Sequence, residues 1–196
     1  PLAGFFSSGR QSSHPLTLPR RSPTLRAMPT ASIFLIGPMG SGKSAVGRRL
    51  ARELGREFID SDDAIEERSG VDIPFIFERE GEAGFRQRES RVIDELTRLP
   101  GIILATGGGS AQDAGNRQYL RERGFVVYLH ATVDQQLKRT RRGRERPMLK
   151  TGEPREVLTR LMAVRDPQFR EIAHLVVETD GRKVPSVVRE IRRNMP

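Results

Sequence analysis

The sequence predicts an α/β protein with a five-stranded parallel sheet and helices on both faces of the sheet. Five apolar, β-forming runs alternate with amphipathic helical patterns, an alternation typical of a parallel sheet that helices cover. The runs cover residues 32–36, 57–60, 101–106, 125–129 and 174–178. With 196 residues, the chain is long enough for one domain with a substantial core. Ligands of such sheets bind beyond the carboxyl ends of the strands, so the residues after each run are the candidates for a site.

The first run is followed by a string that indicates a phosphate-binding loop, GPMGSGKS from Gly37 to Ser44. Its glycines leave room for backbone N–H groups to converge on a phosphate at the positive end of the next helix. Lys43 can reach the terminal phosphates, and the Ser44 hydroxyl can ligate Mg²⁺. The alternative is an ordinary glycine-rich turn. The position between a β-forming run and a helical pattern favours the nucleotide site.

Two carboxylates stand at the end of the second run: Asp60 is its last residue, and Asp62 follows two residues later. Spaced by one residue at a strand end, they point to the same side, where one can support a metal ion and the other can orient an acceptor hydroxyl. The alternative is a helix N-cap supplied by Ser61, Asp62 or Asp63, with the helix beginning near Ala64. The residue types alone leave both interpretations open.

The next helical region, from Ile73 to Leu99, is long and is predicted to break near Gly81. Its Arg86 would ordinarily be a solvated helix arginine. The third run leads into the tripeptide 107–109, three glycines on which a ligand could lie against the backbone. The alternative for the tripeptide is a plain loop.

The most basic window, residues 138–150, holds seven cations and one acid. Gly143 and Pro147 interrupt its helical pattern, which indicates a mobile lid whose arginine could neutralise a transferring phosphoryl group. An RNA-binding loop is the alternative. It is less favoured, because no aromatic side chain lies between the cations to stack on bases.

Composition narrows the classes of protein that remain. The formal net charge is +9, which suits nucleic acid, an acidic membrane or a site for polyanionic small molecules. No cysteine is present, and no apolar run approaches the roughly 20 residues of a membrane span. Residues 1–27 hold four arginines and no acid and are predicted to be disordered, either as a transit-like extension or because the start was assigned too early. The folded domain is expected to comprise residues 28–196.

From Ile33 to about Arg192 the chain resembles the shikimate kinase family. The motifs that carry the resemblance are GPMGSGKS, FIDSD, IFEREGEAGFR, TGGG, RPML and AVRDPQFR, in that order. The resemblance implies transfer of the γ-phosphoryl group of ATP to the 3-hydroxyl of shikimate, giving shikimate 3-phosphate and ADP. It also implies a three-layer phosphate-loop kinase fold with strand order 2-3-1-4-5, a substrate-binding subdomain at about 64–97 and a lid at about 141–152.

On the nucleotide side, the resemblance implies that the loop binds the ATP phosphates and that Ser44 and Asp60 serve one Mg²⁺ per subunit. Arg139 and Arg182 match positions near the adenine, and Arg146 matches the lid arginine, although Arg144 could compete for that role. The nucleotide-binding residues are thus Gly40, Ser41, Gly42, Lys43, Ser44, Ala45, Arg139, Arg146 and Arg182.

On the acceptor side, Asp62 matches the acid that holds the reacting hydroxyl. Arg86 and Arg165 match the arginines that bind the carboxylate of shikimate, a role that suits the guanidinium fork. Gly108, flanked by Gly107 and Gly109, matches a backbone contact to the substrate. The expected catalytic residues are Lys43, Asp62 and Arg146.

The expected mechanism is direct in-line transfer without a phosphoenzyme and without a catalytic histidine. The expected partners are shikimate and ATP, with no nucleic acid and no membrane, for a cytoplasmic protein that acts as a monomer. Two alternatives stay open: a related small-molecule kinase such as gluconate kinase, and a basic phosphate-loop protein that binds nucleic acid.

Overall fold

The structure is a computed structural model that describes residues 31–140 and 152–196. Its strands are β1 (Ser32–Ile36), β2 (Phe58–Asp60), β3 (Ile103–Ala105), β4 (Gly124–His130) and β5 (Leu175–Glu178). Its helices are α1 (Lys43–Leu54), α2 (Ser61–Ser69), α3 (Ile73–Leu96), α4 (Ala114–Arg123), α5 (Val133–Thr140), α6 (Pro154–Ile172) and α7 (Val184–Asn194), with a 3₁₀ turn, η1 (Ser110–Gln112).

The five strands form one parallel sheet in the order β2-β3-β1-β4-β5, which confirms the predicted fold class and strand order. Every residue of the central strand β1 is buried. This burial explains why its sequence is a continuous apolar run rather than an alternating one. The switch from β3 to β4 on either side of β1 places the ends of these strands around the loop that follows β1.

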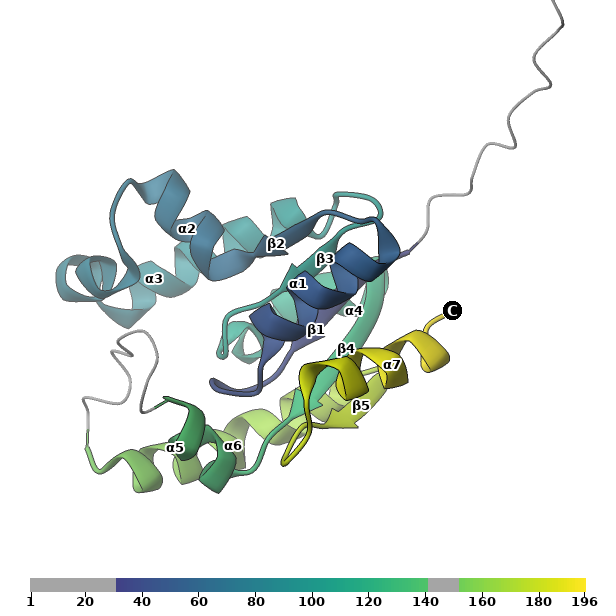
Figure 1. Cartoon of the computed structure of the whole chain (residues 1–196). Helices are drawn as coiled ribbons and strands as arrows, with labels where there is room; N and C mark the ends of the chain where they lie inside the picture. Colours follow the sequence, from purple (N-terminus) through teal and green to yellow (C-terminus); the bar gives the residue numbers. More distant parts are fainter. Residues whose placement is uncertain (1–30, 141–151) are drawn as a thin grey trace, which may run out of the picture.

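Helices cover both faces of the sheet, as Figure 1 shows. On one face α1 and α7 pack side by side over a core that includes Leu35, Leu50 and Val188. On the other face α3, α4 and α6 enclose a core that includes Phe34 and Tyr128. The central strands β1, β3 and β4 therefore supply side chains to the cores on both faces of the sheet.

Helix α3 bends at Gly81, as predicted. This residue has φ 68° and ψ −174°, a non-helical conformation inside an otherwise helical segment. The region ends at Leu96 rather than Leu99, because the chain turns at Thr97, whose hydroxyl donates to the carbonyl of Ile93 at 2.8 Å. Arg86 lies in the second part of the bent helix.

Helix α2 begins at Ser61, earlier than the predicted start near Ala64. Its N-cap is Asp60, whose Oδ1 accepts from the backbone N–H of Asp62 at 3.1 Å. The alternative interpretation, in which Ser61, Asp62 or Asp63 caps the helix, is therefore wrong in its residues, because the cap is Asp60. The strand leads straight into the helix, and Asp62 lies in the first helical turn.

Two predicted segments, the extension 1–27 and most of the lid 141–152, lie outside the described residues. Within residues 31–140 and 152–196, the structure contains no helix that is both long and apolar enough to cross a membrane.

Candidate active site

The loop between β1 and α1 is built around three glycines in conformations that favour glycine. Gly37, Gly40 and Gly42 have φ of 140°, 73° and 96°. A side chain at Gly37 would also collide with the carbonyl oxygen of Leu129 on β4. Helix α1 then begins with no side-chain cap, which leaves the N–H groups of its first turn for an anionic ligand.

The ammonium of Lys43 lies over this loop. Its Nζ donates to the carbonyl oxygens of Gly37 at 2.7 Å and Pro38 at 2.8 Å. A cavity of about 180 Å³ opens beside it. The lining residues come from the loop and from the ends of β2 and β3: Met39, Gly40, Gly42, Lys43, Ser44, Ala45, Asp62, Thr106 and Gly108. The cavity thus joins the predicted nucleotide residues to the predicted acceptor residues.

Ser44 and Asp60 meet at the edge of this cavity. The Ser44 hydroxyl donates to Asp60 Oδ2 at 2.6 Å, so a hydroxyl and a carboxylate oxygen lie side by side at the start of α1. Mg²⁺ prefers such hard oxygen ligands and takes few of them from the protein, because substrate phosphates and water supply the others. The described residues include no cluster of three or more His, Cys, Asp or Glu that could hold a metal ion. The residues present fit Mg²⁺ carried with a nucleotide.

The acceptor side is organised around the backbone of Gly107. A Cβ there would lie 2.5 Å from Glu89 Oε1 and 2.8 Å from Asp62 Oδ1, so two carboxylates approach the space that only glycine leaves open. The N–H of Gly107 donates to the Ser61 hydroxyl at 2.9 Å. Of the three glycines, Gly108 is the one that lines the cavity.

Arg86 and Arg165 converge on the same glycine turn from different helices. Arg86, on α3, lies so close to Gly109 that a side chain there would overlap its guanidinium. Arg165, on α6, donates from Nη1 to the Gly108 carbonyl at 3.1 Å. Arg165 is only 4% exposed, and burial, together with the charge of Arg86, lowers its pKa to about 10. It is therefore still a cation at neutral pH.

Glu89 is the residue of this site that the sequence interpretation missed. Its Oε2 accepts from Arg86 Nη1 at 2.6 Å, and its Oε1 is buried with no hydrogen-bond partner among the described residues. The side chain is 1% exposed, and burial raises the pKa of its carboxyl, which the charge of Arg86 opposes. The sequence did carry one signal for this contact: Glu89 follows Arg86 by three residues, a spacing that places two side chains next to each other on a helix.

The two arginines expected near the adenine differ in position. Arg139 Nη1 donates to the carbonyl of Gly40 at 2.9 Å, and its Nη2 donates to the carbonyl of Thr179 at 2.8 Å. Arg139 therefore contacts the phosphate loop directly. Arg182 instead turns toward α7, where it pairs with Glu190 at 2.6 Å. The structure brings Arg139, but not Arg182, into contact with the loop.

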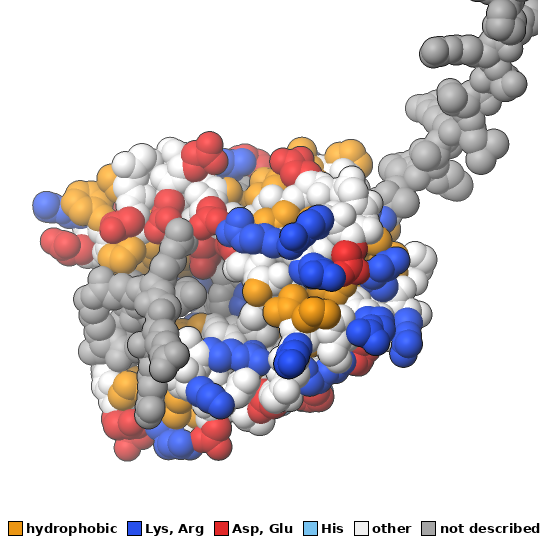
Figure 2. Space-filling model, in the orientation of Figure 1, with side chains coloured by type: hydrophobic (Ala, Val, Ile, Leu, Met, Phe, Trp, Pro, Cys, Tyr) orange, Lys and Arg blue, Asp and Glu red, His pale blue; other side chains and the backbone are white. Residues whose placement is uncertain are grey.

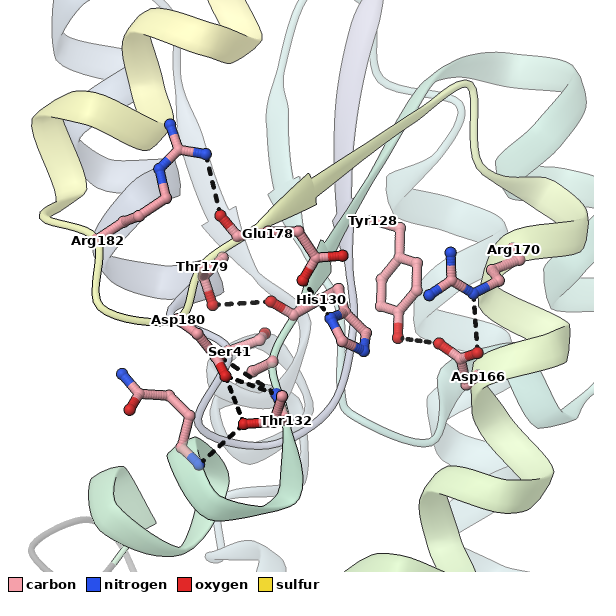
Figure 3. A network of polar contacts seen from close by, with 12 residues as sticks. Ser41, Tyr128, His130, Thr132, Asp166, Arg170, Glu178, Thr179, Asp180 and Arg182 are labelled. Atoms are coloured by element: carbon pink, nitrogen blue, oxygen red, sulfur yellow. Dashed lines mark hydrogen bonds and ion pairs between the residues drawn. The ribbon is translucent and has the colours of Figure 1, made fainter.

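The carboxyl ends of β4 and β5 form a polar network (Figure 3), and Arg139 donates to one of its members, Thr179. Thr179 donates through its hydroxyl to the His130 carbonyl at 2.9 Å, and His130 Nδ1 contacts Glu178. Asp180 accepts from the backbone N–H of Thr132 at 3.2 Å and also from its hydroxyl. These bonds tie the two strand ends together on the nucleotide side of the site.

A second part of this network fixes α6, which carries Arg165. The buried hydroxyl of Tyr128 donates to Asp166 Oδ1 at 2.7 Å, and Arg170 donates to Asp166 Oδ2 at 2.8 Å (Figure 3). Burial alone would raise the pKa of Asp166, but the hydrogen bonds from Arg170 and Tyr128 lower it below its usual range. A charged Asp166 thus anchors α6 to β4 one residue from Arg165.

The predicted lid residues Arg144 and Arg146 lie outside the described residues. The excess of positive charge is visible elsewhere: Figure 2 shows Lys and Arg side chains over α1 and α7 and acidic side chains near α2 and α3. Part of the basic surface is neutralised locally, since Glu53 pairs with Arg49 at 2.6 Å and with Arg192 at 3.0 Å.

Comparisons with known proteins agree on one family. A family model described as shikimate kinase matches residues 39–196. A shikimate kinase of Halorhodospira halophila is 57% identical over 159 residues, which are 81% of this chain and 90% of that protein. The structure of shikimate kinase from Acinetobacter baumannii in complex with shikimate has a TM-score of 0.82 at 48% identity and covers 84% of this chain and 92% of that one. A gluconokinase from Sinorhizobium meliloti 1021 shares the fold alone, with a TM-score of 0.52 at 23% identity over 83% of this chain and 89% of that one.

Proposed function

Because the chain belongs to the shikimate kinase family, it is an ATP-dependent phosphotransferase that acts on shikimate, and we propose how its own residues perform the transfer. The observation that carries the proposal is the cavity between α1 and the ends of β2 and β3. Lys43 and Ser44 line it on one side, and Asp62 and Gly108 line it on the other. A nucleotide and an acceptor bound there would be neighbours.

The nucleotide half holds the triphosphate of ATP. The N–H groups of residues 40–45 would surround the phosphates, and Lys43 would leave its loop carbonyls to neutralise them. Ser44 and Asp60 would hold one Mg²⁺ per subunit, Ser44 as a ligand and Asp60 beside it. When bound, the ion supplies positive charge to the phosphoryl oxygens.

The acceptor half holds shikimate by its carboxylate. The guanidinium groups of Arg86 and Arg165 converge on the glycine turn, and a carboxylate placed between them would accept charge-assisted hydrogen bonds from both. Gly108 would contact the substrate through its backbone. Asp62 would orient the 3-hydroxyl and accept its proton late in the transfer.

The reaction needs no covalent intermediate, because both substrates lie in one cavity. Positioning accounts for much of the catalysis, and cations balance the charge that develops on the moving group. In this proposal those cations are Lys43, the Mg²⁺ when bound, and Arg146 of the lid. The adenine contacts of Arg139 and Arg182, a monomeric state, a cytoplasmic location and the domain limits stay predictions.

The proposal is tested by ADP release from MgATP with purified protein and four acceptor conditions: shikimate, gluconate, AMP and no acceptor. We expect release that depends on shikimate alone. Release with gluconate or AMP in place of shikimate would overturn the roles of Asp62, Arg86 and Arg165. Salt-dependent binding to DNA or RNA, without release in any condition, would instead support the nucleic-acid alternative.

A further inference from the structure

Arg165 differs from Arg86 in what holds its guanidinium. Arg86 donates to two carboxylates, those of Glu82 at 3.0 Å and Glu89 at 2.6 Å. Arg165, the more deeply buried of the two, has no carboxylate among its hydrogen-bond partners in the described residues. A buried cation that is bonded only to neutral acceptors retains its charge for a ligand, although its desolvation is only partly compensated.

The neutral partner of Arg165 is Gln112, the last residue of η1. The Gln112 amide oxygen accepts from Arg165 Nε and from Nη2, each at 2.6 Å. The amide must present its oxygen here, because a guanidinium has only donors and an amide nitrogen would oppose them. One oxygen therefore holds two N–H groups on one edge of the guanidinium.

These contacts determine which part of Arg165 is left for a substrate. A guanidinium has five N–H donors in a fixed plane. Gln112 occupies the edge formed by Nε and Nη2, and the Gly108 carbonyl accepts from Nη1 at 3.1 Å. Two of the five N–H groups, one on Nη1 and one on Nη2, have no hydrogen-bond partner among the described residues, and both belong to the end of the side chain near the glycine turn.

We propose that Gln112 is a positioning residue for Arg165 and that its neutrality is required for binding the substrate's carboxylate. It holds the guanidinium plane by the edge away from the ligand and adds no negative charge of its own, so that among the described residues no carboxylate is hydrogen-bonded to Arg165. An acid at position 112 would fix the same plane but would satisfy the charge internally. The inference rests on the proposed role of Arg165 in binding the carboxylate of shikimate.

The test uses two substitutions that separate geometry from charge. Gln112→Met keeps similar length without an amide acceptor, and we expect its KM for shikimate to rise about tenfold. Gln112→Glu adds a carboxylate, and we expect a larger rise in KM for shikimate together with an increase in Tm. In both variants kcat at saturating shikimate and KM for ATP should stay within about twofold of wild type.

The rise in Tm of Gln112→Glu alongside weaker shikimate binding is the result that a purely structural residue would not produce. Gln118→Met is the matched control, since Gln118 lies on the exposed side of α4 and bonds only Glu122 among the described residues. We expect it to match wild type. Wild-type KM for shikimate in Gln112→Glu, or parallel loss of kcat and Tm in Gln112→Met, would overturn the proposal.

Arg165→Lys separates failure of this inference from failure of the proposed function. If Arg165 binds the substrate's carboxylate, Arg165→Lys raises KM for shikimate, and adding Gln112→Met then has little further effect. An additive effect of the two substitutions would overturn the positioning role alone. Unchanged KM in Arg165→Lys would overturn the assignment of Arg165, and the inference with it.

Discussion

Asp60 and Asp62 lie two residues apart, yet their surroundings give them different tasks. Asp60 accepts from the Ser44 hydroxyl and from the N–H of Asp62, so it caps α2 and, in the proposed mechanism, stands on the metal side. Asp62 lines the cavity and lies beside Gly107, on the acceptor side. In the proposed mechanism a single strand end thus serves both halves of the site.

Replacing Asp62 by Asn tests the acceptor role directly. The amide cannot accept the proton of the reacting hydroxyl, so we expect kcat to fall by roughly a hundredfold or more while the Kd for ATP changes little. Steady-state kinetics and nucleotide titration measure the two quantities. Asp63→Asn is the control, because Asp63 contacts Arg48 at 3.6 Å on the surface. Full activity of Asp62→Asn would remove Asp62 from the mechanism.

Replacing Glu89 by Gln tests the support of Arg86. Glutamine can still accept from Arg86 but carries no charge, so the buried ion pair is lost, and we expect the KM for shikimate to rise about tenfold or more and the KM for ATP to stay unchanged. Glu82→Gln removes the more exposed partner of Arg86 and should change KM by less than about fivefold. Equal effects of the two substitutions would show that burial of Glu89 has no consequence for binding.

At the scale of elements, α3 depends on a glycine at its bend. Gly81 has φ 68° and ψ −174°, a region that other residues occupy at a cost of about 1–3 kcal/mol, and open space surrounds it. We therefore expect Gly81→Ala to lower the free energy of unfolding by that amount through the backbone alone. Chemical denaturation measures it.

Gly70→Ala is the matched control for Gly81→Ala. Gly70 has a similar φ of 68° but an ordinary left-handed ψ of 7°, also in open space. Alanine tolerates that conformation better, at about 1 kcal/mol. A loss at Gly81 no larger than the loss at Gly70 would contradict the backbone explanation.

The junction of α6 and β5 should weaken in acid. His174 Nδ1 accepts from the N–H of Val126 at 3.0 Å, which requires a neutral nitrogen. Burial, and then the charge of Arg121, lower the pKa of His174. The stability that this group contributes is therefore complete above the unfolded pKa of about 6.5 and is lost as the pH falls through the lower folded pKa.

Denaturant unfolding of wild type and His174→Asn between pH 8 and pH 5 measures this contribution. We expect wild type to lose more stability over this range, by a small amount, since only the Nδ1 side of His174 is partly buried and the residue as a whole is exposed. The asparagine does not titrate and can still accept the hydrogen bond. Identical pH dependence in both proteins would contradict the role of His174.

At the scale of the whole molecule, the sequence predicted the sheet because its signals are local. The buried strand β1 has the limits that were predicted for it. Glycines in the sequence indicated both the phosphate loop and the bend in α3. The limits of β2 and β3 were less accurate. Strand β2 begins one residue later than predicted, and β3 is shorter than predicted at both ends, because pairing, which the apolar runs do not reveal, sets their limits.

Contacts between distant helices could not be predicted from residue patterns. The resemblance named Arg86 and Arg165, but only the fold places α3 and α6 so that both reach one glycine turn. Glu89 and Gln112 look like ordinary surface residues of a helix and a turn in the sequence. Their importance follows from the arginine that each contacts.

The central claim is that one cavity brings the γ-phosphoryl group of ATP to the 3-hydroxyl of shikimate. The most direct measurement is the position of the phosphate in the product, by ³¹P and ¹H NMR after turnover, with a parallel assay for label on the protein from γ-labelled ATP. We predict a single phosphate on the 3-hydroxyl and no labelled protein. A phosphate on another hydroxyl, or a chemically competent phosphoenzyme, would contradict the account.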